Sequence, residues 1–241
     1  MLIIFDLDGT LINTISDLGQ ACNHALAACG FPTHKIEDYP RLVGNGVNKL
    51  IERALPPTHR NEETVLRLRE FFVPYYDEHN CDFTRPYDGI PELLKALKEQ
   101  GHFLAVASNK YQAATTKIVE QLFPGIFDVV LGERVGVERK PNPQIVYDIL
   151  STLLSQLSTL NSQTSTLNCL YIGDSLVDAE TARAAASQLS NLNSQLSTLN
   201  PQLSLVLCTW GFGTREQMEG AKPDYLVDHP LEILKVKELN S

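Results

Sequence analysis

The chain has 241 residues, 43% of them hydrophobic and 20% charged, and its 20 basic and 29 acidic residues give a net charge of −9. The length suits one well-developed core with a modest second domain, and the composition is ordinary for a soluble globular protein. The acidic balance argues against general nucleic-acid binding, because phosphate backbones require a basic face.

Short apolar runs that end in polar or glycine-containing turns predict a series of buried parallel strands. The first run is Leu2–Phe5, which leads directly into Asp6. Helical patterns alternate with the later runs, and this order predicts an α/β fold: a doubly wound, Rossmann-like parallel sheet with helices on both faces. The further strands are expected at Phe103–Ala107, Phe127–Leu131, Leu170–Ile172 and Leu205–Cys208, and the helices at Ile90–Gln100, Gln112–Leu122, Pro143–Leu150 and Val177–Ala186.

Residues 14–82 interrupt this alternation. They have helical patterns throughout, with breaks at 30–32, 44–46 and 56–57, and they contain no strand-like run. We therefore expect a small helical cap, residues 14–82, inserted after the first strand. The α/β catalytic core would then consist of residues 1–13 and 83–241.

Two low-complexity tracts, residues 155–168 and 187–204, repeat a seven-residue unit of the type SQLSTLN. In the second tract the leucines have the 3, 4, 3, 4 spacing of a coiled-coil seam, but Ser, Thr and Asn are mediocre helix formers. A solvated insertion and a packed amphipathic helix therefore both remain open. Each tract lies between a helix and the next strand, so we expect it at the amino edge of the sheet, away from the carboxyl edge where such folds bind ligands.

Two pairs of carboxylates follow two of the predicted strands. Asp6 and Asp8 come directly after the first strand, and Asp174 and Asp178 follow Leu170–Ile172 with a spacing that places both on one face of a helix beginning there. An Asx turn and a helix N-cap are the ordinary structural alternatives. Four carboxylates at two strand ends would repel one another without a cation, which favours bound Mg²⁺. Within the first pair, one carboxylate could act as nucleophile and the other as proton donor.

Two weaker signals follow other strands. Ser108 and Asn109 offer hydroxyl, amide and backbone N–H groups that suit phosphate oxygens, although a simple helix cap is the better explanation of these two residues taken alone. Lys140, which Pro141 restricts to an extended backbone, could neutralise phosphate charge and hold the nucleophile, whereas a solvated surface lysine is the alternative. Four polar sites that each follow a separate strand make coincidence a poor explanation.

Four segments resemble, in order and spacing, the motifs of the haloacid dehalogenase superfamily: Asp6-Leu7-Asp8-Gly9-Thr10-Leu11, Ser108-Asn109, Lys140-Pro141 and Gly173-Asp174-x-x-x-Asp178. The insertion after the first motif is similar to that of the subfamily with an α-helical cap. Within the chain, 43–47, 50–55 and 210–213 are similar to segments of phosphoglycolate phosphatases.

The resemblance implies a Mg²⁺-dependent phosphatase. It implies that Asp6 attacks phosphorus to form an aspartyl phosphate, and that Asp8 protonates the leaving alcohol and then activates water. Mg²⁺ would be held by the Asp6 carboxylate, the Asp8 main-chain carbonyl and Asp174, with Asp178 supporting the metal shell. The phosphoryl group would be held by Thr10, Ser108, Asn109 and Lys140.

The cap is expected to recognise the rest of the substrate through Gly44, Asn45 and Lys49. The glycines on either side of Asn45 let the backbone approach closely and can present N–H groups to an anion. Lys49 or Arg41 would add positive charge, which favours a short dianionic substrate such as 2-phosphoglycolate. A simple helix break with both cations solvated remains the alternative.

Two other functions stay open: a sugar-phosphate mutase of the β-phosphoglucomutase type, and a non-catalytic assembly module that uses the repeats as its interface. The expected partner is a small phosphorylated metabolite, with no nucleic acid and no membrane, and the protein is expected to be a monomer or homodimer. Five cysteines without a C-x-x-C pair predict free thiols in the cytoplasm. The N-terminus lacks signal-peptide features, and no run approaches the about 20 apolar residues of a membrane span.

Overall fold

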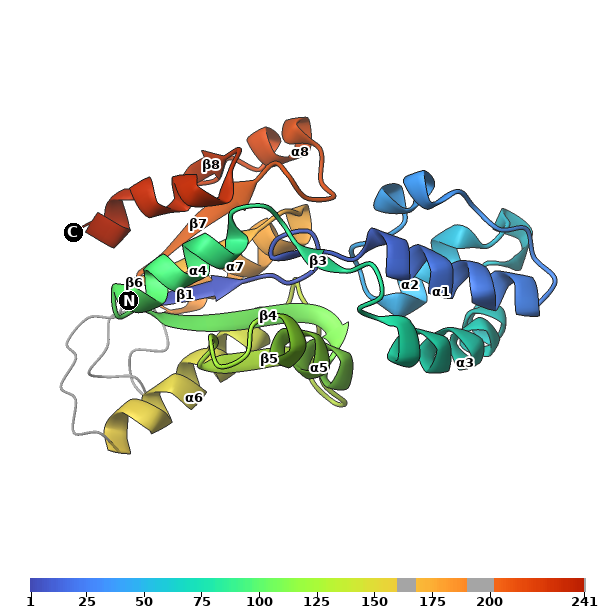
Figure 1. Ribbon diagram of the computed structural model, residues 1–241, viewed down its shortest axis with the longest axis horizontal. Helices are drawn as coiled ribbons and strands as arrows, with labels where there is room; N and C mark the ends of the chain where they lie inside the picture. The colour runs from blue at the N-terminus through green and yellow to red at the C-terminus, as the bar shows by residue number, and fades with distance from the viewer. Residues whose placement is uncertain (160–167, 190–201, 241) are drawn as a thin grey trace.

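The computed structural model describes residues 1–159, 168–189 and 202–240 (Figure 1). Its main feature is a six-stranded sheet in the order β5-β4-β1-β6-β7-β8, in which every pair of neighbours is parallel. The predicted doubly wound α/β fold is confirmed. The strands are β1 Leu2–Phe5, β4 Phe103–Tyr111, β5 Val129–Glu133, β6 Asn168–Gly173, β7 Gln202–Cys208 and β8 Tyr225–Val227.

Helices cover both faces of this sheet. Helices α6 (Gln144–Thr159) and α7 (Leu176–Leu189) share an apolar cluster with the Leu2 and Ile4 side of β1. Helices α4 (Ile90–Glu99) and α5 (Gln112–Leu122) pack with Ile3 and Phe5 on the other side. Because successive strand residues point to opposite faces, burial on both faces explains why β1 is a continuous apolar run without alternation.

The chain leaves and re-enters this core through two short strands that pair antiparallel, β2 (Ile12–Asn13) and β3 (Arg85–Pro86). Between them lie the helices α1 (Ile15–Ala28), α2 (Val47–Ala54) and α3 (Glu62–His79), which Figure 1 shows beyond the carboxyl ends of the strands. These helices bury a third apolar cluster, which Ala114 of the core also joins. The shorter helical elements are α8 Arg215–Gly220 and the 3₁₀ helices Ile36–Arg41, Pro57–His59, Pro230–Lys235 and Lys237–Asn240.

Some elements differ from the prediction because tertiary pairing extends or creates them. Strand β4 continues beyond the predicted end to Tyr111, where it pairs with Glu133 after a register shift. Strand β8 and helix α8 were not predicted, since three and six residues carry too little periodicity to be recognised. Among the helices that the structure describes, none combines the length and apolar character that a membrane crossing requires.

The two repeat tracts are described only at their ends. Helix α6 runs into the first tract as far as Thr159, and α7 ends in the second at Leu189, whose side chain is buried. Residues 160–167 and 190–201 lie outside the described residues, so both conformations proposed for the tracts stay open. Asn168 and Gln202, which come directly after these gaps, pair with each other where β6 and β7 begin, at the amino edge of the sheet.

Candidate active site

The site lies where the order of strands reverses direction. The sheet grows from β1 towards β4 and β5 on one side and towards β6, β7 and β8 on the other, and such a switch point leaves a crevice at the carboxyl edge. Asp6 follows β1 and its backbone N–H donates to Ile172 O of β6 at 2.8 Å. Asp174 lies in the turn after β6, and Asp178 lies in the first turn of α7. The neighbouring ends of β1 and β6 therefore bring the carboxylates of Asp6, Asp174 and Asp178 together.

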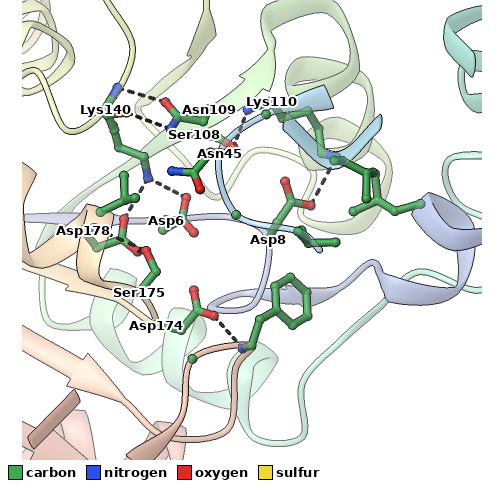
Figure 2. Close-up of a pocket in the computed structure, with 18 of the residues that line it drawn as sticks. Asp6, Asp8, Asn45, Ser108, Asn109, Lys110, Lys140, Asp174, Ser175 and Asp178 are labelled. Carbon is green, nitrogen blue, oxygen red and sulfur yellow. Dashed lines mark hydrogen bonds and ion pairs between the residues drawn. The ribbon is translucent and has the colours of Figure 1, made fainter. Parts of the chain in front are cut away.

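Lys140 joins two of these carboxylates. Its Nζ lies 2.7 Å from Asp6 Oδ1 and 2.8 Å from Asp178 Oδ1, and it donates to Ala107 O at 2.8 Å (Figure 2). The lysine side chain is 3% exposed, so bulk water screens these contacts little. Burial opposes the charged form of Lys140, but the Asp178 and Asp6 carboxylates outweigh it and raise the pKa of Lys140 well above its usual value.

Asp174 is held from two other directions. Its carboxylate accepts hydrogen bonds from the Thr10 hydroxyl at 3.2 Å and from the Phe212 backbone N–H at 2.7 Å. A Cβ atom at Gly9 or at Gly211 would overlap this carboxylate, so both loops need glycine to lie against it. Thr10 is fully buried and faces Asp174, and it is not among the described residues that line the cavity. Its contacts fit an orienting role for Asp174 better than the predicted contact with substrate.

The carboxylate cluster carries more negative charge than its lysine neutralises. Asp6, Asp174 and Asp178 can each offer an oxygen within 4.8 Å of the others. Burial raises the pKa of Asp6 well above its usual range, and burial together with the nearby Asp178 raises the pKa of Asp174 to about 7. Three acidic groups beside one ammonium leave a deficit of two positive charges, and oxygen donors suit a hard divalent ion. The residues present therefore fit Mg²⁺.

Asp8 stands apart from this cluster. Figure 2 shows its side chain directed away from Asp6, towards Lys110, and Lys110 Nζ lies 3.2 Å from Asp8 Oδ1. The same Nζ donates to the hydroxyl of Tyr76 on α3 at 2.7 Å. Sequence reasoning missed Lys110, although it directly follows Ser108-Asn109. The sequence analysis did not identify Tyr76 as a site residue either, and the structure shows its side chain buried.

Asn109 and Ser108 have different surroundings. The Asn109 side chain donates to Lys140 O at 3.0 Å and accepts from Lys140 N at 2.9 Å, so its amide is committed to holding the lysine backbone. Ser108 Oγ accepts a hydrogen bond from Lys110 N at 3.1 Å, which leaves its own hydrogen available to donate. Both residues line the cavity.

A cavity of about 770 Å³ connects these groups to the helical insertion. Gly44, Asn45 and Arg53 line its far side, as expected for the first two. Lys49 does not: it is exposed, and its Nζ contacts Glu52 at 2.5 Å. Arg53, which sequence reasoning missed, donates to the carbonyl oxygens of residues 42 and 43 and to the side-chain oxygen of Asn45. Among the described residues it has no carboxylate partner.

Comparisons with known proteins find relatives along nearly the whole chain. The model of the haloacid dehalogenase-like hydrolases matches residues 3–190. The phosphoglycolate phosphatase of Aquifex aeolicus (strain VF5) is 29% identical over 237 residues, which cover 98% of this chain and 96% of that protein. The phosphoglycolate phosphatase of Agrobacterium fabrum (strain C58 / ATCC 33970) is 35% identical over 188 residues, 77% of each chain. A crystal structure from Lactobacillus delbrueckii subsp. bulgaricus has a TM-score of 0.78 at 31% identity and covers 96% of this chain and 95% of its own.

Proposed function

This chain belongs to the haloacid dehalogenase-like hydrolase family, and from that premise we propose that it is a Mg²⁺-dependent phosphatase of small organic phosphate monoesters. The observation that carries the proposal is the buried pair of Asp6 and Lys140, 2.7 Å apart, at the end of the central strand and beside two further carboxylates. The relatives from A. aeolicus and A. fabrum support 2-phosphoglycolate as the favoured substrate. None of the five cysteines forms a disulfide, which supports a cytoplasmic enzyme.

The proposed reaction divides the work between Asp6 and Asp8. An Asp6 carboxylate oxygen attacks phosphorus and the bond from phosphorus to the alcohol oxygen breaks, while the Asp8 carboxyl gives its proton to that oxygen. The Asp8 carboxylate then takes a proton from water, the water oxygen attacks phosphorus, and the bond to Asp6 breaks. Inorganic phosphate leaves and Asp6 is restored. The different neighbours of the two carboxylates, Lys140 for one and Lys110 for the other, support different roles.

Mg²⁺ would be held by the carboxylates of Asp6 and Asp174 and the main-chain carbonyl of Asp8. When bound, the ion supplies positive charge opposite the phosphoryl oxygens. Asp178 is also engaged by Lys140, by the Tyr171 hydroxyl at 3.2 Å and by Ser175 Oγ at 2.5 Å, so we assign it a supporting place in the metal shell.

The phosphoryl group would be held by the core, with Lys140 balancing its charge and the Ser108 hydroxyl donating to one oxygen. The cap, which we place at residues 14–82, would read the rest of the substrate. The cavity is several times larger than a two-carbon phosphate ester, so its volume does not exclude sugar phosphates. The guanidinium of Arg53, which has no carboxylate partner among the described residues, lies beside Asn45 and favours a substrate with a second negative group, such as a carboxylate.

Phosphate release from a panel of metabolites with Mg²⁺ tests the activity. We expect kcat/KM for 2-phosphoglycolate to exceed that for hexose phosphates and nucleotides. A mutase would instead convert a sugar phosphate to its isomer with little phosphate release, and an assembly module would release none.

A matched pair of cap variants tests the substrate choice. Arg53→Met should lower kcat/KM for 2-phosphoglycolate about tenfold or more, the equivalent of ~1.4 kcal/mol, and change that for 4-nitrophenyl phosphate much less. Lys49→Met removes a cation one helical turn away that already contacts Glu52, and it should change neither value appreciably. Equal losses for the two esters in Arg53→Met would contradict the role of the cap, while the phosphatase activity itself would stand.

A further inference from the structure

We propose that Lys110 is a positioning residue for Asp8, and that Tyr76 makes this positioning depend on how α3 is seated on the core. The inference rests on the proposed phosphatase activity and adds to it a group that acts only through the proton-transfer residue. Lys110 is distinct from the lysine that serves Asp6, since Lys140 contacts Asp6 and Asp178. The site thus holds its two working carboxylates with two separate ammonium groups.

The backbone of Lys110 is fixed on both sides of its side chain. Its N–H donates to Ser108 Oγ at 3.1 Å, and its carbonyl oxygen accepts from the Thr115 hydroxyl at 3.0 Å. It lies within the stretch of β4 where the pairing with β5 shifts register, between Ala107 and Tyr111. Such an irregularity re-aims side chains at the end of a strand. Here the irregularity directs the Lys110 ammonium, whose side chain is 4% exposed, at Asp8. A regular strand would not predict this direction of the side chain.

The Lys110 ammonium connects the α/β core with helix α3 of the helical insertion. Its Nζ is 3.2 Å from Asp8 Oδ1 in the core, 2.7 Å from the Tyr76 hydroxyl on α3, and 4.7 Å from the centre of the Tyr76 ring. Tyr76 is itself buried. Because the ammonium has lost most of its water, moving the Tyr76 hydroxyl away would leave a buried donor unsatisfied.

Two neighbouring contacts make this bridge part of a seam, which consists of Tyr76 and Asp77 on α3 against Lys110, Tyr111 and Lys117 of the core. The Tyr111 hydroxyl donates to the Asp77 carboxylate, and Lys117 Nζ donates to Asp77 O. All three core residues come from the end of β4 and from α5. The seam therefore fixes the end of α3 on the core at the place where Lys110 reaches Asp8.

The chemical consequence concerns which oxygen of Asp8 does the work. Lys110 engages Oδ1, so Oδ2 is the oxygen left to carry the proton to the leaving alcohol and later to receive one from water. Lys110 keeps its protons throughout and forms no bond to the substrate. A misplaced Asp8 should matter most where the leaving group needs the proton, as an alcohol does, and least for a phenol that departs readily as its anion.

This distinction gives the experiment. We would measure kcat/KM for 2-phosphoglycolate and for 4-nitrophenyl phosphate in wild type, Lys110→Met, Tyr76→Phe and Lys98→Met. The ratio kcat/KM reports steps up to transfer of the phosphoryl group to Asp6, so it isolates protonation of the leaving group. Lys110→Met should lower the value for the alkyl ester about 10²-fold, near the lower end for proton-transfer catalysis, and that for the aryl ester several-fold at most. Tyr76→Phe should show the same pattern with smaller losses.

Lys98→Met is the control, because it removes a lysine that contacts Asp128 and belongs neither to the seam nor to the site, and kcat/KM for both esters should stay close to wild type. Equal losses for the two esters in Lys110→Met, or the same leaving-group pattern in Lys98→Met, would overturn the inference. A wild type that hydrolyses neither ester would instead overturn the proposed function, and the inference with it. If Lys110→Met does not give a folded protein by circular dichroism, Tyr76→Phe, which loses one hydroxyl, decides between the same outcomes.

Discussion

Replacement of Lys140 by methionine removes the ammonium that lies between two buried carboxylates. Lys140 Nζ lies 2.7 Å from Asp6 Oδ1 and 2.8 Å from Asp178 Oδ1, and the lysine side chain is 3% exposed. Methionine has a similar length and no charge, so both carboxylates would stay in place without compensation. Loss of one partner of a buried ion pair costs about 3–5 kcal/mol. We expect a loss of this size in the free energy of unfolding at pH 8, in the presence of a chelator.

The same variant should recover stability in acid, because its carboxylates can take up protons. In wild type, burial already raises the pKa of Asp6 well above its unfolded value and that of Asp174 to about 7. A carboxyl with a raised folded pKa contributes stability below its unfolded pKa of about 4, and this stability is lost as the pH rises through the folded pKa. Each such group costs about 1.4 kcal/mol per pH unit over that window. The difference between wild type and Lys140→Met should therefore be smaller at pH 5 than at pH 8.

Urea unfolding at the two pH values, with Lys98→Met as control, measures this. Lys98 is a partly exposed lysine paired with a single carboxylate, Asp128, at 3.1 Å, so its removal should cost about 0–1 kcal/mol at either pH. If Lys140→Met is no more destabilising than Lys98→Met, or its loss is the same at pH 5 and pH 8, the cluster is not under the charge deficit that we describe.

Further outcomes are expected for the catalytic carboxylates, the metal and the repeat tracts. Asp6→Asn should abolish phosphate release without unfolding the protein, and Asp8→Asn should lower kcat by about 10²–10⁴-fold; near-normal turnover by the first variant would contradict the nucleophile. Excess chelator should stop activity and Mg²⁺ should restore it. Because the pKa of Asp174 is raised to about 7, protons compete with the ion below that pH, so saturating Mg²⁺ should raise the melting temperature more at pH 8 than at pH 6; equal shifts would argue against Asp174 as a ligand. Replacement of residues 160–167 and 190–201 by shorter glycine-serine turns should leave kcat within about tenfold (~1.4 kcal/mol), since the described residues directly after both gaps lie at the amino edge of the sheet; a greater loss in a folded variant would refute that placement.

The fold, and the place in it where the candidate site residues lie, could be predicted from the sequence because both depend on local order along the chain. An apolar run buried on both faces must be an inner strand, and the residues directly after it must lie at the carboxyl edge. Asp6, Ser108 and Asp174 therefore meet wherever β1, β4 and β6 are neighbours. The helical insertion was recognisable for the same reason, since 14–82 lacks any strand-like run.

The direction of individual side chains depended on contacts between distant segments. Lys49 and Arg53 lie one turn apart on α2, and nothing in their spacing indicates which one reaches the cavity. Arg53 does so because it bonds the backbone of the preceding loop, whereas Lys49 contacts Glu52. Thr10, predicted to contact substrate, is turned inward by its hydrogen bond to Asp174 across 164 positions of the chain.

The clearest case is the bridge between Asp8 and Tyr76 through Lys110. Sequence alone determined that Asp8 follows the first strand and that Tyr76 lies within the helical segment of residues 14–82. Tyr76 and Lys110 are 34 positions apart, and they meet only because the end of α3 is seated against β4 and α5. A register shift late in β4 then aims the lysine. Local residue patterns predict the strands and the polar residues that follow them. An ion pair between distant residues forms only where packing brings their two backbone segments within reach of one side chain.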